Sequence, residues 1–237
     1  MRRDHRPIAW QRLARRISQW YIRRFLRPQL DQCGEGLEIV GPQYVSFSGV
    51  NILLGRHVHM MALSDAPIRL AVFEGMGRVE VGNHVLINPG VRLVSASAIE
   101  IGDNCMLAMH CHLSDADWHD TSHRIFAPGY AAPIKLGCNV WLGDSVKVLK
   151  GVSIGDNTIV GAGAVVTKDL PANVVAGGNP AVVLQSLPEG GQATTREALF
   201  TMEESYADFA DRFASERLRG NTLVDWLRSW VAPNKKD

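Results

Sequence analysis

A six-residue repeat is the feature that most constrains this chain. From residue 134, aliphatic or small residues recur at every sixth position in two series offset by two residues. The members are Leu136, Leu142, Val148, Ile154, Val160 and Val166, and Ile134, Val140, Val146, Val152, Thr158 and Ala164. Neither the 3.6-residue period of an α-helix nor the two-residue alternation of a half-buried strand gives this spacing. It fits a coil with three flat faces, each a short strand followed by a tight corner, in which each aliphatic residue stacks on its copy one coil later.

Fainter copies of the repeat lie upstream of residue 134. They are Leu54, Met60, Val81, Ile87, Leu93, Ile101, Leu107 and Leu113. The predicted repeat domain therefore spans residues 37–185. It is interrupted once, at 114–133, where the register breaks and polar and turn residues gather. We expect this segment to protrude, and interruptions of a repeat array often carry function.

The amino-terminal 27 residues are strongly basic. They hold nine arginines and one acid, Asp4, whereas the whole chain of 237 residues has a net charge of only +1, which gives no indication of a nucleic-acid partner. Over residues 1–30 the sequence predicts an amphipathic helix with apolar residues such as Trp10 and Ile17 opposite the arginines. Two interpretations stand: residues 1–27 make a peripheral contact with an anionic membrane, or the helix packs on the β-helix of its own or a neighbouring subunit.

The rest of the sequence indicates where the protein is located and predicts the structure of its carboxyl-terminal end. There is no apolar run of about 18 residues, no secretory signal and no C-x-x-C pair among four scattered cysteines. We therefore expect a cytoplasmic protein with reduced thiols, with the inner face of the cytoplasmic membrane as the place of any lipid contact. Residues 190–237 predict a helical extension in which Asn221 caps the last helix. It packs on a neighbouring subunit or serves as a lid or partner site.

Residues 134–184, "IKLGCNVWLGDSVKVLKGVSIGDNTIVGAGAVVTKDLPANVVAGGNPAVVL", resemble the last coils of the galactoside, maltose and nodulation-type O-acetyltransferases. The resemblance is close over the second half of the repeat domain and loose over the first. It implies an all-β, left-handed parallel β-helix with flanking amino- and carboxyl-terminal α-helices. It also implies a homotrimer with active sites between subunits, acetyl-CoA as co-substrate, no metal, and a hydroxylated acceptor such as a saccharide.

Acyl transfer to a hydroxyl needs a base and donors for the developing oxyanion. The family places its catalytic histidine in the protruding segment, so the resemblance implies that His119 in "DADWHD" is the general base, with His123 as its rival. Asp115 or Asp117 would hold the imidazole in the required tautomer, or both are plain loop acids. Asn88 in "VGNHVLINPG" falls where relatives keep an asparagine that lines the acceptor and oxyanion site, and it is otherwise a corner asparagine.

The coenzyme contacts are also implied by the resemblance. The run "NVWLGD" at 139–144 is similar to the family's "NVWIGS", which sets Trp141 beside the pantetheine groove, with Gly143 next to it and the Asp144 N–H facing the thioester oxygen. Where relatives have serine this chain has Asp144, and an acid there repels an oxyanion if the hydroxyl mattered.

A second run, "GAGAVVTKD" at 161–169, completes the implied coenzyme groove. Small residues at Ala162 and Gly163 let the coenzyme approach, and Thr167 and Lys168 meet its phosphates. An arginine that many relatives place after the turn at Pro180 is missing.

Four functions remain open on the sequence. The first is O-acetylation of a sugar, glycan or lipid-linked acceptor, and the second is N-acylation of an amino-sugar nucleotide. The third is a γ-carbonic-anhydrase-like zinc enzyme, for which His110, His112, His119 and His123 supply ligand types without that family's motif. The fourth is a non-catalytic scaffold, against which the intact coenzyme motif argues.

Overall fold

The computed structural model describes residues 4–73, 75–122, 124–125, 128–188, 194–200 and 206–232. The chain divides into two compact units. The β-helix unit is Tyr21–Arg196, and the helical unit combines Met1–Trp20 with Glu197–Asp237.

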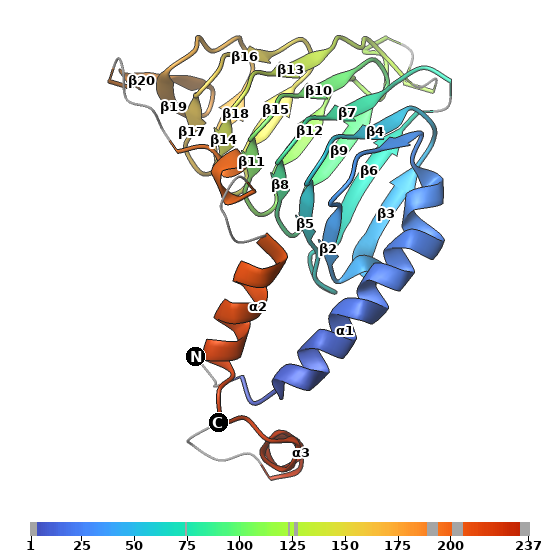
Figure 1. Cartoon of the computed structure of the whole chain (residues 1–237). Coiled ribbons are helices and arrows are strands. Elements are labelled where there is room, and N and C mark those ends of the chain that lie inside the picture. Colours follow the sequence, from blue (N-terminus) through green and yellow to red (C-terminus); the bar gives the residue numbers. More distant parts are fainter. Residues whose placement is uncertain are drawn as a thin grey trace. The chain divides into compact units, whose positions relative to one another are not determined.

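Three sheets form the β-helix unit, and from β1 to β18 the chain visits them in the order A, B, C (Figure 1). Sheet A contains β1 (Gln32–Cys33), β4 (Ile52–Leu54), β7 (Val79–Val81), β10 (Ile99–Ile101), β13 (Ile134–Leu136) and β16 (Ser153–Ile154). Sheet B contains β2 (Glu38–Val40), β5 (His59–Met61), β8 (Leu86–Ile87), β11 (Met106–Leu107), β14 (Trp141–Leu142), β17 (Ile159–Val160), β19 (Val174–Gly178) and β20 (Ala181–Ser186). Sheet C contains β3 (Val45–Ser48), β6 (Ile68–Val72), β9 (Arg92–Ser95), β12 (His112–Ser114), β15 (Lys147–Leu149) and β18 (Val165–Val166). All named strand pairs are parallel except β19 with β20, so the predicted left-handed parallel β-helix is confirmed.

The core is the stack of inward side chains that the repeat predicts. Every member of the two predicted series is at most 4% exposed. The strand register places Leu107 beside Leu142 and Leu142 beside Val160, so equivalent positions stack from coil to coil. Each such aliphatic side chain contributes about 1.5–3 kcal/mol by leaving water.

Tight corners join the sheets, and we name them A/B, B/C and C/A after the sheets they connect. At the A/B corner, asparagines adopt the left-handed backbone conformation on successive coils, which asparagine tolerates better than most residues. Their side chains also form a ladder: Asn139 Nδ2 donates to Asn157 Oδ1 at 3.0 Å, and Asn157 Nδ2 donates to Asn173 Oδ1 at 2.9 Å. The corner therefore fixes the stacking of the coils as well as the turn.

The predicted interruption is a loop that leaves the C/A corner. Strand β12 ends at Ser114 and β13 begins at Ile134, so residues 115–133 lie between them. An antiparallel bridge between Ala116 and Ala131 closes the base of this loop. Strands begin at Gln32 and end at Ser186, so the strands begin slightly before the predicted boundary at residue 37.

Helices lie at both ends of the chain. They are α1 (Ile8–Tyr21), the π-helical η1 (Ile22–Leu26), the short 3₁₀ helices η2 (Arg27–Gln29), η3 (Pro42–Tyr44) and η4 (Arg196–Leu199), α2 (Tyr206–Arg217) and α3 (Leu223–Val231). The predicted cap at Asn221 is wrong, because the Thr222 hydroxyl accepts the Asp225 N–H and so caps α3. Within the helical unit, Arg12 pairs with Asp211 at 2.6 Å. None of the helices in the described part of the chain has the length and apolar character needed to cross a bilayer.

Candidate active site

His119 lies in the loop at the C/A corner with an exposed side chain. Trp118 anchors this part of the loop, because its Nε1 donates to Ser114 Oγ at 3.0 Å and its ring lies 6.1 Å from that of Phe73. Gly129 closes the loop, since a Cβ there would lie 2.8 Å from the His119 carbonyl oxygen. No described residue hydrogen-bonds or pairs with the His119 imidazole. The loop therefore presents a free imidazole, and the rival His123 lies outside the described residues.

Asp115 is a buried structural carboxylate. Its Oδ1 accepts the Ala96 N–H at 2.7 Å, and its Oδ2 accepts the Ser95 hydroxyl at 2.7 Å and the Ser97 N–H at 3.0 Å. The side chain is 0% exposed. It binds the C/A corner of the preceding coil, and no hydrogen bond joins it to His119. Within one chain the Asp115 carboxylate is thus engaged by Ser95, Ala96 and Ser97, and its predicted role in orienting His119 stays a prediction.

Asp117 is exposed and also engaged elsewhere. Its Oδ1 lies 2.7 Å from Lys150 Nζ, which belongs to the next coil. The structure therefore gives the His119 imidazole neither predicted acid. Sequence reasoning missed Lys150 and Gly129, although a glycine inside a polar loop is itself a signal of close backbone approach.

Asn88 lies at the B/C corner, where its Nδ2 donates to the Leu107 carbonyl oxygen at 2.9 Å. Gly143 holds the equivalent place two coils later, because the backbone N–H groups of Asn88 and Gly143 each donate to the inward strand residue of the following coil. Two strand spacings separate the two positions, about 10 Å along the corner. Asn88 therefore shares the edge of the predicted coenzyme wall without touching it.

The coenzyme wall is an exposed strip along the same corner. Trp141 points outward from β14 and is 46% exposed, as predicted. Gly143 must be glycine, because a Cβ there would lie 2.7 Å from the Ala162 backbone nitrogen. The backbone N–H groups of Asp144 and Ala162 donate to no residue that the structure describes. Beside them Gly163, at φ +72°, faces open space. Two free donors on neighbouring coils suit carbonyl oxygens of a thioester or an amide.

Two neighbours define the chemistry of this strip. The Ser145 hydroxyl donates its hydrogen to the Asp144 carboxylate at 2.6 Å, so that hydrogen is engaged within the corner itself. Behind the strip, the Cys111 thiol lies 3.2 Å from the Gly143 carbonyl oxygen, and burial raises its pKa to about 12. Cys111 is therefore a protonated core residue near neutral pH, which removes it as a nucleophile.

Thr167 and Lys168 lie elsewhere, at the C/A corner of the last coil, and both are exposed. They follow β18 of sheet C, whereas Asp144 and Ala162 precede sheet C in their coils. The structure thus divides the predicted site into two groups at opposite edges of sheet C. One group is at the B/C corner, around Asp144, and the other is at the C/A corner, around His119.

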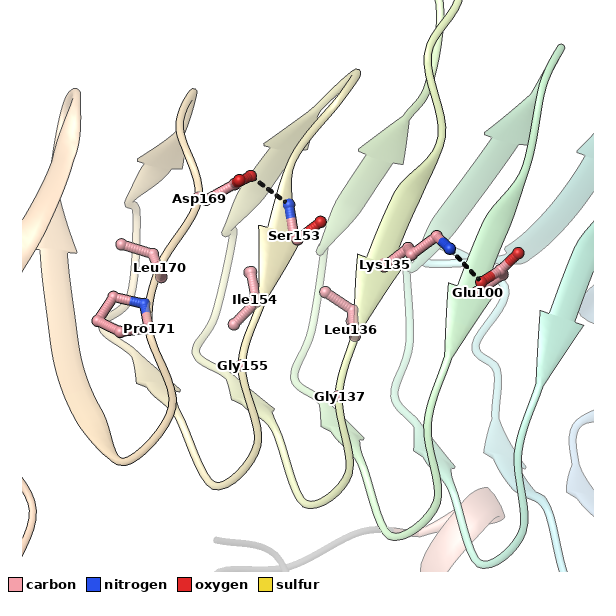
Figure 2. A pocket seen from close by; sticks show the side chains of 10 residues that line it. All are labelled: Glu100, Lys135, Leu136, Gly137, Ser153, Ile154, Gly155, Asp169, Leu170 and Pro171. Atoms are coloured by element: carbon pink, nitrogen blue, oxygen red, sulfur yellow. Dashed lines mark hydrogen bonds and ion pairs between the residues drawn. The ribbon is translucent and has the colours of Figure 1, made fainter.

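A separate hollow of about 720 Å³ lies over the outer face of sheet A and contains none of the predicted site residues. Figure 2 shows Leu136, Ile154 and Leu170 on successive coils beneath it. Its polar groups bind one another, since Asp169 accepts the Ser153 N–H at 2.7 Å and Lys135 pairs with Glu100 at 3.5 Å. These contacts hold coils together and leave no group poised for reaction.

A metal site was one alternative from the sequence. Among the described residues, which exclude His123, no three histidine, cysteine or acidic side chains gather as metal ligands. His110 packs over Gly90 at the B/C corner, and His112 lies on β12. The zinc interpretation therefore finds no ligand set in this part of the chain.

These features define a left-handed β-helix transferase whose candidate site is a histidine loop and a corner of free N–H donors. Comparisons with known proteins agree with the fold and identify the family. The family model "Bacterial transferase hexapeptide (six repeats)" matches residues 133–168. The putative acetyltransferase YJL218W of Saccharomyces cerevisiae is 35% identical over 170 residues, covering 72% of this chain and 73% of that protein. The chain belongs to the hexapeptide-repeat acetyltransferase family.

Two further likenesses are informative. The galactoside O-acetyltransferase of Escherichia coli (strain K12) is 39% identical over 111 residues, which is 46% of this chain and only about half, 54%, of that enzyme. A crystal structure of a mutant of AntD, an N-acyltransferase from Bacillus cereus, in complex with dTDP and coenzyme A, covers 80% of this chain and 94% of that one. It has a TM-score of 0.52 and 16% identity, a likeness of fold alone.

Proposed function

We propose that this protein transfers an acetyl group from acetyl-CoA to a hydroxyl of a saccharide, with His119 as the general base. The observation that carries the proposal is the exposed His119 imidazole, which has no partner among the described residues, in the loop that interrupts the repeat. Family membership supports the acetyl donor, and the name of the galactoside O-acetyltransferase supports a sugar acceptor.

The reaction follows from these groups. His119 removes the proton of the acceptor hydroxyl as its oxygen attacks the carbonyl carbon of the thioester. The N–H of Asp144 donates to the carbonyl oxygen as it becomes negative. The carbon–sulfur bond then breaks, and the imidazolium returns its proton to the leaving thiolate. The products are an acetyl ester and coenzyme A with a free thiol.

We propose further that each site is shared between two copies of the chain in a homotrimer. His119 and Asp144 lie at opposite edges of sheet C in one chain, whereas a neighbouring copy can bring its C/A corner to the B/C corner of the first. The outer face of sheet B supports such packing, because its outward positions from β8 to β19 form an apolar row. The row is Leu86, Met106, Trp141, Ile159 and Val175. Thr167 and Lys168 would then meet the coenzyme from the neighbouring copy.

A peripheral membrane contact through residues 1–27 is also part of the proposal, at the inner face of the cytoplasmic membrane. Helix α1 carries Trp10, Leu13, Ile17 and Trp20 at three- and four-residue spacing, and all are 43–55% exposed. Residues 8–29 add six arginines and no acid. An exposed apolar stripe flanked by arginines suits the interface of an anionic bilayer.

The base assignment is tested with purified full-length chain, acetyl-CoA and a panel of saccharides, with free thiol as the readout. His119→Ala should lower kcat/KM by about 10²–10⁴-fold and leave the Kd for coenzyme A unchanged by calorimetry. His123→Ala is the matched control in the same loop and should keep most of the activity. Near-normal turnover in His119→Ala would remove the base assignment.

Mixed oligomers test whether the site is shared. Ala162→Trp should block the coenzyme wall at an exposed position and abolish turnover by itself. Coexpressed with His119→Ala chains, it should restore about one quarter of wild-type activity, since a quarter of shared sites receive both intact halves. No recovery in verified mixed oligomers would place the whole site in one chain.

A further inference from the structure

Four basic side chains stand in a row across the outer face of sheet C. Strand register sets Arg69 beside Arg92, Arg92 beside His112, and His112 beside Lys147. Their neighbours along each strand are buried, so these four side chains point outward. Adjacent strands lie about 4.8 Å apart, so this basic row extends for about 14 Å along the β-helix.

Among the residues that the structure describes, the basic row has no partner of opposite charge. None of Arg69, Arg92, His112 and Lys147 forms an ion pair or hydrogen bond with a described residue. The other outward positions of sheet C carry no acid either: they are Ser46, Ser48, Ala71, Val94, Ser114, Leu149 and Val165.

Sheet A handles its charges differently. There Glu100 lies between Glu80 and Lys135, and Arg78 hydrogen-bonds to Glu100. Although Glu80 and Glu100 are neighbours, Arg78 pairs with both of them and Lys135 pairs with Glu100, so the charges on that sheet neutralise one another. Because the same fold pairs its charges on sheet A, the uncompensated row on sheet C is a specific feature of that face.

Like charges on directly opposite strand positions oppose folding. The pKa of His112 is lowered, first by burial and then by repulsion from Arg92 and Lys147. A bound anion would relieve it, and guanidinium groups are suited to bind carboxylates and phosphates through two parallel hydrogen bonds.

The position of the row indicates which substrate carries the anion. It crosses the face between the corner of Asp144 and the corner of His119. Lys147 belongs to the coil of Asp144, but Arg92 and Arg69 lie two and three coils nearer the amino terminus, away from the coenzyme wall. The row therefore extends past the acetyl donor toward the side left for the other substrate.

We infer that the basic row binds the carboxylate or phosphate groups of an anionic saccharide acceptor. That this saccharide is the acceptor rests on the proposed acetyl transfer. The anion-binding site itself is defined by the row alone. It selects acceptors that carry several negative charges about 5 Å apart, or one charge next to the reacting hydroxyl.

The experiment measures binding in the absence of acetyl-CoA, with full-length chain and two matched ligand pairs. Fluorescently labelled trigalacturonate is compared with its neutral methyl ester, and glucose 1-phosphate is compared with glucose. The first pair tests carboxylates and the second tests phosphate. We expect the charged member of at least one pair to bind at least tenfold more tightly than its neutral partner at low salt.

Two double variants distinguish binding by the basic row from attraction by the overall positive charge of the protein. Arg69→Gln with Arg92→Gln should weaken binding of the charged ligand by about 25-fold, at about fivefold for each exposed arginine. Arg15→Gln with Arg16→Gln removes the same charge from exposed positions of α1 and should change binding less than twofold. Neither double variant should change the Kd for coenzyme A.

Several results would overturn the inference. They are equal binding of charged and neutral ligands in both pairs, equal losses in the two double variants, or a loss of coenzyme A binding in the row variant. Binding without acetylation of any saccharide would remove the proposed function and leave the anion site standing. Acetylation of neutral sugars alone, with no anion binding, would remove the anion site and leave the proposed function standing.

Discussion

Replacing Asp115 by alanine separates a structural role from a catalytic one. The carboxylate accepts hydrogen bonds from the Ser95 hydroxyl and from the N–H groups of Ala96 and Ser97, and it is 0% exposed. A hydrogen bond to a charged group contributes about 1.5–3 kcal/mol, and a buried donor left without its acceptor costs a similar amount. Counting only the two fully buried donors, Ser95 and Ala96, we expect a loss of at least about 3 kcal/mol.

Thermal unfolding followed by circular dichroism measures this loss. For a chain of this size each kcal/mol lowers Tm by about 2–4 °C, so Asp115→Ala should lower Tm by at least about 6 °C. Asp117→Ala is the comparison, because its pair with Lys150 is exposed and contributes at most about 1 kcal/mol. Below its own Tm, each variant should keep kcat within about tenfold of wild type, since neither acid contacts the imidazole.

The opposite outcome has a clear form. If Asp115 orients His119 as the acid of a triad does, its loss lowers kcat by about 10⁴-fold. A variant with wild-type Tm and that kinetic defect would refute the structural role. Asp115→Asn adds a check, because it keeps the shape but turns one acceptor into a donor, and it should lie between wild type and alanine in Tm.

Two further predictions concern the helical unit. The Arg6 side chain lowers the pKa of Asp4 from 3.8 to about 2, so this ion pair adds stability above pH 4 that is lost as the pH falls toward 2. Because Arg217 of α2 also pairs with Asp4 at 3.5 Å, the hydrogen-exchange protection factors in α2 should fall over that range in wild type and not in Asp4→Asn. On the exposed stripe of α1, Ile17→Glu should lower flotation with phosphatidylglycerol vesicles severalfold, whereas Val40→Glu on sheet B should not. Equal flotation of the two variants would contradict the membrane contact.

The fold was predictable because its signal is local and repeated. In a three-sided coil, one side chain of each short strand is buried against the equivalent side chain of the next coil. The repeat in the sequence therefore predicts the stacking of Leu107, Leu142 and Val160. The exposed face of Trp141 follows from the same count, since its neighbours already occupy inward positions. Nothing comparable repeats in the helical unit, where the position of the last cap was missed by one residue.

The environment of Asp115 was harder to predict, because its partners come from another coil. The residues that bind it lie 18 to 20 positions earlier, at a corner that approaches only when the coils stack. A signal was nevertheless present in the parity of the strand. Leu113 points inward, and Asp115 lies two residues later on the same side of the strand. The alternation therefore predicts that the Asp115 carboxylate points into the coil beside Ser95. Its closeness to His119 along the chain suggested a triad instead. The catalytic role of His119 stays a prediction.

The division of the site between two corners also follows from counting. One coil takes 18 residues in this region, so Asp144 and Ala162 fall on the same corner. Thr167 lies five residues past Ala162 and so reaches the next corner, with a strand of sheet C between them. Side-chain movements within one chain cannot bring these two corners together, because a strand of sheet C separates them. Contact between two copies of the chain could place the B/C corner of one beside the C/A corner of the other. In the homotrimer that we propose, the C/A corner of one copy would meet the B/C corner of another, and the basic row lies on the face between these two corners of one chain.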